Sequence, residues 1–318
     1  MKQFTSVKDI DSLEEMISLA QKMKENPFVN KHLGENKTLG LLFFNPSLRT
    51  RMSTQKAAMN LGMQIMVMNV NSDGWQIELE NGTVMNQGTS EHIKEAAGVL
   101  SQYCDVIGIR AFANLKNQQE DYEEKILNKF IEFASVPVIS LESATKHPLQ
   151  SFADVLTIEE NKTKKKPKIV LTWAPHPKAL PQAVANSFVG WIKETEAELV
   201  IANPKGFDLN PEITKGIPVL HNQEEALENA DFVYVKNWSS YEDYGKTLED
   251  ENWMLTQEKM DKTNHGKFMH CLPVRRNVVV SDEVIDSQAS LVLEQANNRT
   301  FSAQAVLYKI LQDGIENS

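Results

Sequence analysis

The segment at residues 43–51 has the residue types of a phosphate-binding turn and reads FFNPSLRTR. An apolar run at 41–44 predicts a buried strand, a proline turn follows, and 52–61 has a helical pattern. A strand–turn–helix junction directs backbone N–H groups and the positive helix end at one point, which suits a phosphate. Two arginines and two hydroxyls add charge-assisted donors there. An ordinary polar turn with exposed arginines has the same pattern. The choice between a phosphate site and such a turn therefore depends on other polar residues of the chain.

Further polar groups stand where a predicted strand ends or a predicted helix begins. Arg110 closes the apolar run 104–109, and ligands of parallel sheets gather at the carboxyl ends of strands. An arginine paired to an acid is the alternative. In the HPLQ segment at 147–150, Pro148 fits the first helical position and leaves His147 near the positive helix end. There His147 can donate to a developing oxyanion, and Gln150 can bond a neutral amide.

The HCLP segment at 270–273 ends another predicted strand. Its backbone carbonyls are candidate acceptors for an amine. Cys271 has no evident base beyond the adjacent His270, so we assign it no nucleophilic role.

Composition excludes several classes of protein. With 318 residues, 41% hydrophobic and 24% charged, the chain is long enough for two α/β domains. A net charge of −10 argues against a nucleic-acid partner. The two cysteines, Cys104 and Cys271, form no CxxC pair and indicate neither a disulfide scaffold nor a metal site. The chain shows no apolar run of membrane-spanning length and no signal peptide, so we expect a cytoplasmic protein without membrane contact.

Short apolar runs alternate with helical patterns along the whole chain. We predict strands at 38–44, 65–69, 106–110, 136–140, 168–173, 198–202, 232–236, 268–271 and 291–294. This alternation is typical of right-handed βαβ units and parallel sheets. The domain boundary is expected within or just after 147–158, before the polar segment 159–167. A Gly-rich turn of the GxGxxG type is missing, which disfavours a nucleotide-dependent oxidoreductase.

The ordered set Ser-x-Arg-Thr-Arg at 47–51, Arg110, His-Pro-x-Gln at 147–150 and His-Cys-Leu-Pro at 270–273 resembles the aspartate/ornithine carbamoyltransferase family. The resemblance covers essentially the whole chain. It implies an α/β fold with two domains, each a parallel sheet flanked by helices. The first, 1–146, binds carbamoyl phosphate, and helix 300–318 packs back on it; the second, 147–299, binds the amine. It also implies a homotrimer with sites at subunit interfaces, and no metal or organic cofactor.

Departures from the ornithine enzymes bear on the substrate. The strand end VKNWSS at 235–240 has Lys236 and lacks the Ser-Met-Gly loop that holds a free amino acid. A free α-ammonium beside Lys236 would be repelled, whereas an N-acylated ornithine keeps only its α-carboxylate. The Pro-rich loop at 173–181 is similar to that of the N-acylornithine branch, whose chains are knotted. By this likeness we expect Glu142, His176 and Lys236 to contact the acylated substrate.

Two further positions follow from the same likeness. Trp75 resembles a residue that the branch lends to a neighbouring subunit's site; an ordinary, partly buried tryptophan is the alternative. Glu91 is typical of N-acetylornithine enzymes, while most of the chain resembles the N-succinylornithine enzymes. A carboxylate there would disfavour the extra carboxylate of succinyl. Alternatively, Glu91 only complements a helix start.

These observations predict transfer of a carbamoyl group from carbamoyl phosphate to the δ-amine of an N-acyl-L-ornithine, giving N-acylcitrulline and phosphate in arginine biosynthesis. We expect N-succinyl-L-ornithine as the substrate, with N-acetyl-L-ornithine and then plain ornithine as alternatives. A non-catalytic anion-sensing protein is a rival that the HPLQ and HCLP segments disfavour. The implied carbamoyl phosphate contacts are Ser47, Leu48, Arg49, Thr50, Trp75, Arg110, His147, Pro148, Leu149, Gln150, Cys271, Leu272 and Arg299. The implied catalytic residues are Arg49, Thr50, Arg110, His147, Gln150 and Cys271. The implied N-acylornithine contacts are Glu142, His176, Lys236, Glu91 and Leu272.

Overall fold

The computed structural model describes residues 1–316, which divide into two compact units. The first unit comprises residues 1–113 and 119–149 and the chain from residue 299 on, and the second comprises 114–118 and 150–298. The last two points at which the chain changes from one unit to the other lie inside helices, namely α7 (Pro148–Asn161) and α13 (Val292–Glu316). Residues 317–318 of the predicted helix 300–318 lie outside the described residues.

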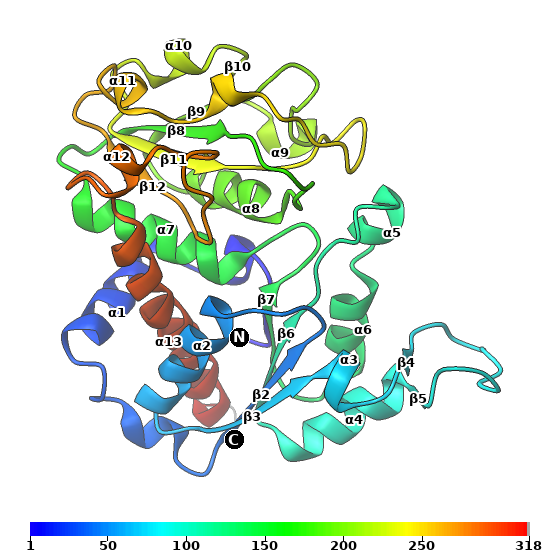
Figure 1. Ribbon diagram of the computed structural model, residues 1–318. Helices are drawn as coiled ribbons and strands as arrows, with labels where there is room; N and C mark the ends of the chain where they lie inside the picture. Colours follow the sequence, from blue (N-terminus) through cyan, green and yellow to red (C-terminus); the bar gives the residue numbers. More distant parts are fainter. Residues whose placement is uncertain (317–318) are drawn as a thin grey trace. The chain divides into compact units, whose positions relative to one another are not determined.

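The first unit is built on a five-stranded parallel sheet with the strand order β1-β7-β6-β2-β3. Helices α1, α2 and α13 cover one side of this sheet, and α4 and α6 cover the other (Figure 1). A small parallel pair, β4 and β5, extends away from it with its connecting loop (Figure 1). The elements are β1 (Gln3–Phe4), α1 (Leu13–Glu25), β2 (Thr38–Phe43), α2 (Arg49–Asn60), β3 (Gln64–Asn69), α3 (Val70–Asp73), β4 (Ile77–Glu78), β5 (Glu91–His92), α4 (Ile93–Tyr103), β6 (Val106–Arg110), α5 (Gln118–Tyr122), α6 (Lys125–Phe133) and β7 (Val138–Glu142), with short 3₁₀ turns at Val7–Asp9 and Lys31–Gly34.

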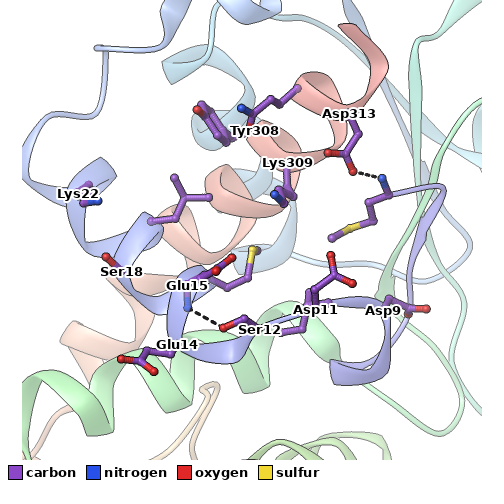
Figure 2. Close-up of a pocket in the computed structure, with 15 residues that line it drawn as sticks. Asp9, Asp11, Ser12, Glu14, Glu15, Ser18, Lys22, Tyr308, Lys309 and Asp313 are labelled. Carbon is purple, nitrogen blue, oxygen red and sulfur yellow. Dashed lines mark hydrogen bonds and ion pairs between the residues drawn. The ribbon is translucent and has the colours of Figure 1, made fainter. Parts of the chain in front are cut away.

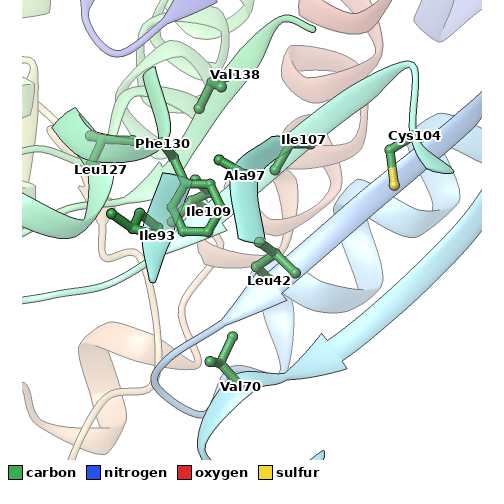
Figure 3. Close-up of a cluster of buried hydrophobic side chains, with 10 residues drawn as sticks. All are labelled: Leu42, Val70, Ile93, Ala97, Cys104, Ile107, Ile109, Leu127, Phe130 and Val138. Carbon is green, nitrogen blue, oxygen red and sulfur yellow. The ribbon is translucent and has the colours of Figure 1, made fainter. Parts of the chain in front are cut away.

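Apolar side chains from the sheet and from α4 and α6 form one core of this unit (Figure 3). Ile107 and Ile109 of β6 meet Ile93 of α4 and Phe130 of α6 there, all essentially excluded from solvent. Each such side chain contributes about 1.5–3 kcal/mol by leaving water. The core fixes β6 in register between β2 and β7, so that Phe43 pairs with Arg110 and Arg110 with Glu142.

The second unit is built on another five-stranded parallel sheet, in the order β10-β9-β8-β11-β12. Its central strands are mostly apolar, and all of their residues except Lys168 are buried, as expected for parallel strands covered by helices. The elements are β8 (Lys168–Trp173), α8 (Ala183–Ile192), β9 (Glu198–Ala202), α9 (Pro211–Thr214), β10 (Val219–Leu220), α10 (Gln223–Leu227), β11 (Phe232–Lys236), α11 (Gln257–Met260), β12 (Lys267–Met269) and α12 (Asp282–Ile285), with a 3₁₀ turn at Glu251–Trp253.

The predicted fold class is confirmed, since both units are parallel sheets flanked by helices. The strand predicted at 291–294 is wrong, because residues from Val292 on begin the 25-residue helix α13. Three consecutive apolar residues cannot distinguish a strand from the first turn of a helix. Four two-residue strands, β1, β4, β5 and β10, were not predicted from the sequence. Within residues 1–316, none of the helices is both long and apolar enough to cross a membrane.

Candidate functional site

The predicted phosphate turn lies between β2 and α2. Leu48 is the residue before the helix, and its side chain makes no capping hydrogen bond; the first turn of α2 contains no acidic residue. Ser47 and Arg49 are partly exposed, whereas Thr50 is buried. Arg299 of α13, also buried, donates from Nη2 to the Thr50 hydroxyl over 2.6 Å. Arg299 therefore places a cation beside Thr50 at the start of α2, where the positive helix end favours an anion.

Arg51 does not join this turn, contrary to the expectation that both arginines serve one anion. Its guanidinium lies 4.7 Å from the centroid of the Phe43 ring and donates to the Asn69 side chain. Successive residues of a helix point in directions about 100° apart. Arg49 and Arg51 therefore lie on opposite sides of α2, and Arg51 ties α2 to β2 and β3.

Arg110, Glu142 and His147 come together at the carboxyl edge of the first sheet. Arg110 donates to Glu142 Oε2 from Nη2 over 2.7 Å and from Nε over 3.1 Å. Its Nη1 donates to the carbonyl oxygens of Asn45 and Pro46 in the phosphate turn. His147 Nε2 lies 3.7 Å from the same Glu142 oxygen. Arg110 is therefore paired with an acid, and it also contacts the backbone of the predicted phosphate turn.

Helix α7 begins at Pro148, as the HPLQ pattern predicts, so His147 directly precedes the helix. His147 is buried, and the Leu149 carbonyl accepts a hydrogen bond of 2.9 Å from the Ser302 hydroxyl of α13. The first turn of α7 is therefore fixed against α13 within the first unit.

In the second unit, Gln150 and the segment after β12 carry the remaining predicted contacts for carbamoyl phosphate. Gln150 is fully buried and donates from Nε2 to Asp154 over 2.7 Å. Cys271 is partly exposed and forms no disulfide bond. The Leu272 N–H donates to His270 Nδ1 over 2.8 Å. The histidine therefore serves as an acceptor that shapes the turn, which leaves no support for a Cys–His nucleophile.

Lys236, His176 and Arg275 form a cationic group in the second unit. Lys236 ends β11, is nearly buried and donates to the Asn237 carbonyl over 3.0 Å. Arg275 Nε donates to His176 Nε2 over 3.1 Å, and His176 Nδ1 lies 2.8 Å from the Lys178 carbonyl. Burial lowers the pKa of His176, and the charges of Lys236, Arg275 and Lys178 lower it further. A neutral ring that donates from Nδ1 and accepts at Nε2 fits both contacts.

Arg275 was missed by the sequence analysis. It lies two residues beyond the HCLP segment and shares no motif with His176, which is 99 residues away in the chain. The only available signal was a basic pair, Arg275 and Arg276, and Arg276 instead forms ion pairs with Asp282 and Asp286.

The Pro-rich loop is held against the segment that follows β11. The Asn237 side chain donates to the Ala174 carbonyl over 2.7 Å, and the Ser239 N–H donates to the Leu180 carbonyl over 2.9 Å. The buried Trp173 indole donates to the Trp238 carbonyl over 2.8 Å. These bonds bring His176 and Lys236 to one place although 59 residues separate them in the sequence.

Trp75 and Glu91 contact each other on the excursion formed by β4 and β5. The Trp75 indole N–H donates to Glu91 Oε2 over 2.8 Å, and 58% of Trp75 is exposed. Glu91 lies in β5, and His92 caps the helix that follows. The helix α4 therefore begins at Ile93, after Glu91, and Glu91 is not its cap. Trp75 is therefore more exposed than an ordinary core tryptophan.

A cavity of about 800 Å³ lies elsewhere in the first unit, between the amino-terminal segment, α1 and α13 (Figure 2). Asp11, Glu14, Lys22 and Lys309 are among its lining residues, and none of its described lining residues is a predicted site residue. Within residues 1–316, no group of three or more His, Cys, Asp or Glu side chains could hold a metal ion. The chemistry of the predicted motifs is therefore remote from this cavity.

Two sequence profiles of one family match the chain. "Aspartate/ornithine carbamoyltransferase, carbamoyl-P binding domain" matches residues 2–160, and "Aspartate/ornithine carbamoyltransferase, Asp/Orn binding domain" matches residues 181–310.

Similar proteins span the full length of the chain. The N-succinylornithine carbamoyltransferase of Bacteroides fragilis (strain 638R) is 48% identical over 98% of this chain and 99% of the relative. The N-acetylornithine carbamoyltransferase of Xanthomonas axonopodis pv. citri (strain 306) is 34% identical over 100% of this chain and 99% of the relative. Among solved structures, a mutant N-acetyl-L-ornithine transcarbamylase with carbamyl phosphate and N-succinyl-L-norvaline aligns with a TM-score of 0.92, at 32% identity, over 98% of this chain and 100% of the other. The chain therefore belongs to the aspartate/ornithine carbamoyltransferase family.

Proposed function

We propose that this protein transfers the carbamoyl group of carbamoyl phosphate to the δ-amine of an N-acyl-L-ornithine, as a step of arginine biosynthesis. The carbamoyl carbon forms a bond to the amine nitrogen, and its bond to the phosphate oxygen breaks. The departing phosphate accepts the proton that the amine loses. The full-length similarity to N-succinylornithine and N-acetylornithine carbamoyltransferases supports this reaction.

The phosphate is proposed to bind at the start of α2. Three kinds of donor there suit the phosphate oxygens. They are the backbone N–H groups of Leu48, Arg49 and Thr50, the hydroxyls of Ser47 and Thr50, and the guanidinium of Arg49. Arg299, which contacts Thr50, adds positive charge beside them. This half of the chemistry rests on residues of the first unit alone.

The carbamoyl oxygen is proposed to accept from Thr50, Arg110 and His147, which stabilises the tetrahedral oxyanion as it forms. The carbamoyl NH2 needs acceptors instead. We assign these to Gln150 and to the backbone carbonyls of Cys271 and Leu272, so Cys271 acts through its backbone and not its thiol. Pro148 and Leu149 serve by starting α7 behind His147.

The cationic group of Lys236, His176 and Arg275 is the observation that carries the choice of amine. A nearly buried ammonium at the end of β11 would repel a free α-ammonium and attract an α-carboxylate. N-acylation removes the first charge and keeps the second. Arg275 supplies a further cation, which suits the extra carboxylate of a succinyl group. We therefore propose N-succinyl-L-ornithine as the substrate, with contacts from Glu142, His176, Lys236 and Leu272.

Glu91 is the observation that favours N-acetyl-L-ornithine instead. Its carboxylate accepts a hydrogen bond from the exposed Trp75. Both residues belong to the segment around β4 and β5, which we propose reaches a neighbouring subunit's site. If the Glu91 carboxylate faces the acyl group there, it disfavours succinyl and tolerates acetyl. A substitution at Glu91 therefore tests the preference between the succinyl and the acetyl substrate.

We also propose a homotrimer. Leu48, Met52 and Met59 lie along one side of α2, and Met66 lies on the edge strand β3; all four are more than half exposed. Exposed apolar side chains grouped in this way are typical of subunit contacts. Light scattering after gel filtration should give three times the chain mass, and Met59→Glu should lower it. A mixture of Trp75→Ala and Arg110→Ala chains should regain activity that each lacks alone, and a fully active monomer would contradict the shared site.

The test of the reaction is phosphate release from carbamoyl phosphate with four amines in parallel: N-succinyl-L-ornithine, N-acetyl-L-ornithine, ornithine and aspartate. We expect the highest kcat/KM with N-succinyl-L-ornithine and the lowest with ornithine and aspartate. Efficient turnover of plain ornithine would overturn the acyl assignment. No turnover with any amine would overturn the reaction and favour an anion-sensing protein.

A further inference from the structure

Asp154 is a fully buried carboxylate that joins two parts of the second unit. It lies one helical turn after Gln150 on α7, and its Oδ1 accepts from Gln150 Nε2 over 2.7 Å. The same oxygen accepts from Gln295 Nε2 of α13 over 2.9 Å. Gln295 Oε1 in turn accepts from the backbone N–H of His270 over 2.8 Å. One oxygen atom therefore connects Gln150 with the turn that begins at His270.

The contact with Asp154 decides which end of the Gln150 amide is presented to a ligand. Because Nε2 points to the carboxylate, Oε1, which lies in the same amide plane on the other side of the Cγ–Cδ bond, points away from Asp154. An NH2 group needs an acceptor, and Oε1 is one. A reversed amide would present an NH2 group to another NH2 group. The orientation of Gln150 therefore depends on an acceptor at position 154.

The turn that Gln295 anchors has a strained backbone. Leu272 has a φ of 55°, in the left-handed region that costs an L-residue about 1 kcal/mol or more. It is held by the hydrogen bond from its N–H to His270 Nδ1. Fixing the His270 N–H through Gln295 therefore fixes the direction of the carbonyl groups that follow.

Tyr234 of β11 lies beside the same network. Its side chain is fully buried beside Asp154 and Cys271. Burial raises the pKa of the Tyr234 phenol well above its usual range, and Asp154 and Cys271 raise it further. The phenol therefore stays protonated and can donate to the carboxylate, which lowers the cost of burying that charge.

We propose that Asp154 is a positioning residue for carbamoyl transfer: its Oδ1 orients Gln150 directly and the His270–Leu272 turn through Gln295. This inference rests on the proposed function, since it concerns the acceptors for the carbamoyl NH2. The proposed role of Asp154 depends on its acceptor oxygen and not on its negative charge. Asparagine can keep that oxygen in place, and alanine cannot.

The experiment compares Asp154→Ala with Asp154→Asn in the full-length protein, using the amine that the wild-type protein turns over. Asp154→Ala should lower kcat by about 100-fold, the loss typical of groups displaced by about 1 Å. Asp154→Asn should keep kcat within about tenfold of wild type. The Kd of inorganic phosphate should stay within about twofold in both, because the proposed phosphate donors lie on the first unit.

Two further variants distinguish positioning from folding. Gln295→Met breaks only the arm to His270 and should lower kcat by about tenfold without changing the phosphate Kd. Asp231→Ala removes a carboxylate at the other end of β11, where Asp231 accepts from the Lys168 N–H over 2.6 Å. It should lower Tm and leave kcat per folded chain unchanged.

Wild-type kcat in Asp154→Ala, or a loss in Asp154→Asn as large as in Asp154→Ala, would overturn the inference. So would a phosphate Kd that weakens in step with kcat. An inactive wild-type protein would instead overturn the proposed function, so the two failures are distinguishable.

Discussion

Glu142 stands where an anionic substrate must compete for Arg110. The carboxylate and the guanidinium are 2.7 Å apart, and their side chains are only 12% and 11% exposed. A phosphate bound beside Arg110 would lie close to that carboxylate, with both negative. We therefore predict that Glu142→Gln binds inorganic phosphate more tightly than the wild-type protein.

The magnitude follows from charge alone, because glutamine keeps an oxygen that can accept from Arg110. Two unit charges about 6 Å apart interact by about 3 kcal/mol at an effective dielectric constant of about 20. Salt and relaxation of Arg110 reduce this repulsion. We expect a gain of about 1.4 kcal/mol, which is about a tenfold lower Kd.

Isothermal titration with inorganic phosphate at constant ionic strength measures this change without turnover. The matched control is Glu132→Gln, which removes a carboxylate 2.9 Å from Lys129 that is 53% exposed. It should leave the phosphate Kd within about twofold, because exposed ion pairs contribute little. An unchanged or weaker phosphate affinity in Glu142→Gln would refute competition at Arg110.

Four other changes test the proposed roles. Arg49→Ala should abolish phosphate release at an unchanged Tm, since it removes a cationic donor with a loss of about 3 kcal/mol or more of transition-state stabilisation; near wild-type kcat would exclude this role. Lys236→Ala should weaken N-acylornithine binding by roughly 2–5 kcal/mol if Lys236 pairs with the α-carboxylate, measured as inhibition by a substrate analogue; Lys246→Ala is the exposed control. Glu91→Pro should raise the kcat/KM ratio of N-succinylornithine to N-acetylornithine by at least roughly tenfold, and an unchanged ratio would place acyl selection elsewhere. The free energy of unfolding, measured by urea denaturation, should fall less between about pH 7 and pH 5.5 in His176→Gln than in the wild-type protein. The pKa of His176 in the folded protein is lowered from 6.5, so the unfolded chain binds more protons below that pH. The stability of the wild-type protein therefore falls as pH falls. Parallel losses in both proteins would contradict this sign.

The sequence determined the fold class and the bounds of four central strands. The runs at 106–110, 168–173, 198–202 and 232–236 match β6, β8, β9 and β11. They could be predicted because strands buried on both faces are continuously apolar and are bounded by polar residues. The family's motifs were also readable, since each is a short local pattern at a strand end or a helix start. The knot in the Pro-rich loop stays a prediction.

Local patterns could not supply the partner of each polar side chain. The turn at 47–51 contains two similar arginines, but packing sends Arg51 to Phe43 and Asn69 while Arg49 stays on the other side of α2. Likewise, nothing near Arg110 in the chain reveals Glu142, which is 32 residues away. Strand register decides that pairing, because β6 and β7 are neighbours in the sheet.

Only the tertiary structure could join Asp154 to Gln295, which is 141 residues further along the chain, or Arg275 to His176. Such contacts depend on which helix and loop pack together, and no periodicity encodes that choice. The run at 291–294 has the same explanation. Its apolar residues are compatible with a strand or a helix, and in the structure residues from Val292 on belong to α13. The sequence determines which groups are present at the strand ends, and tertiary packing decides which atoms of those groups face each other.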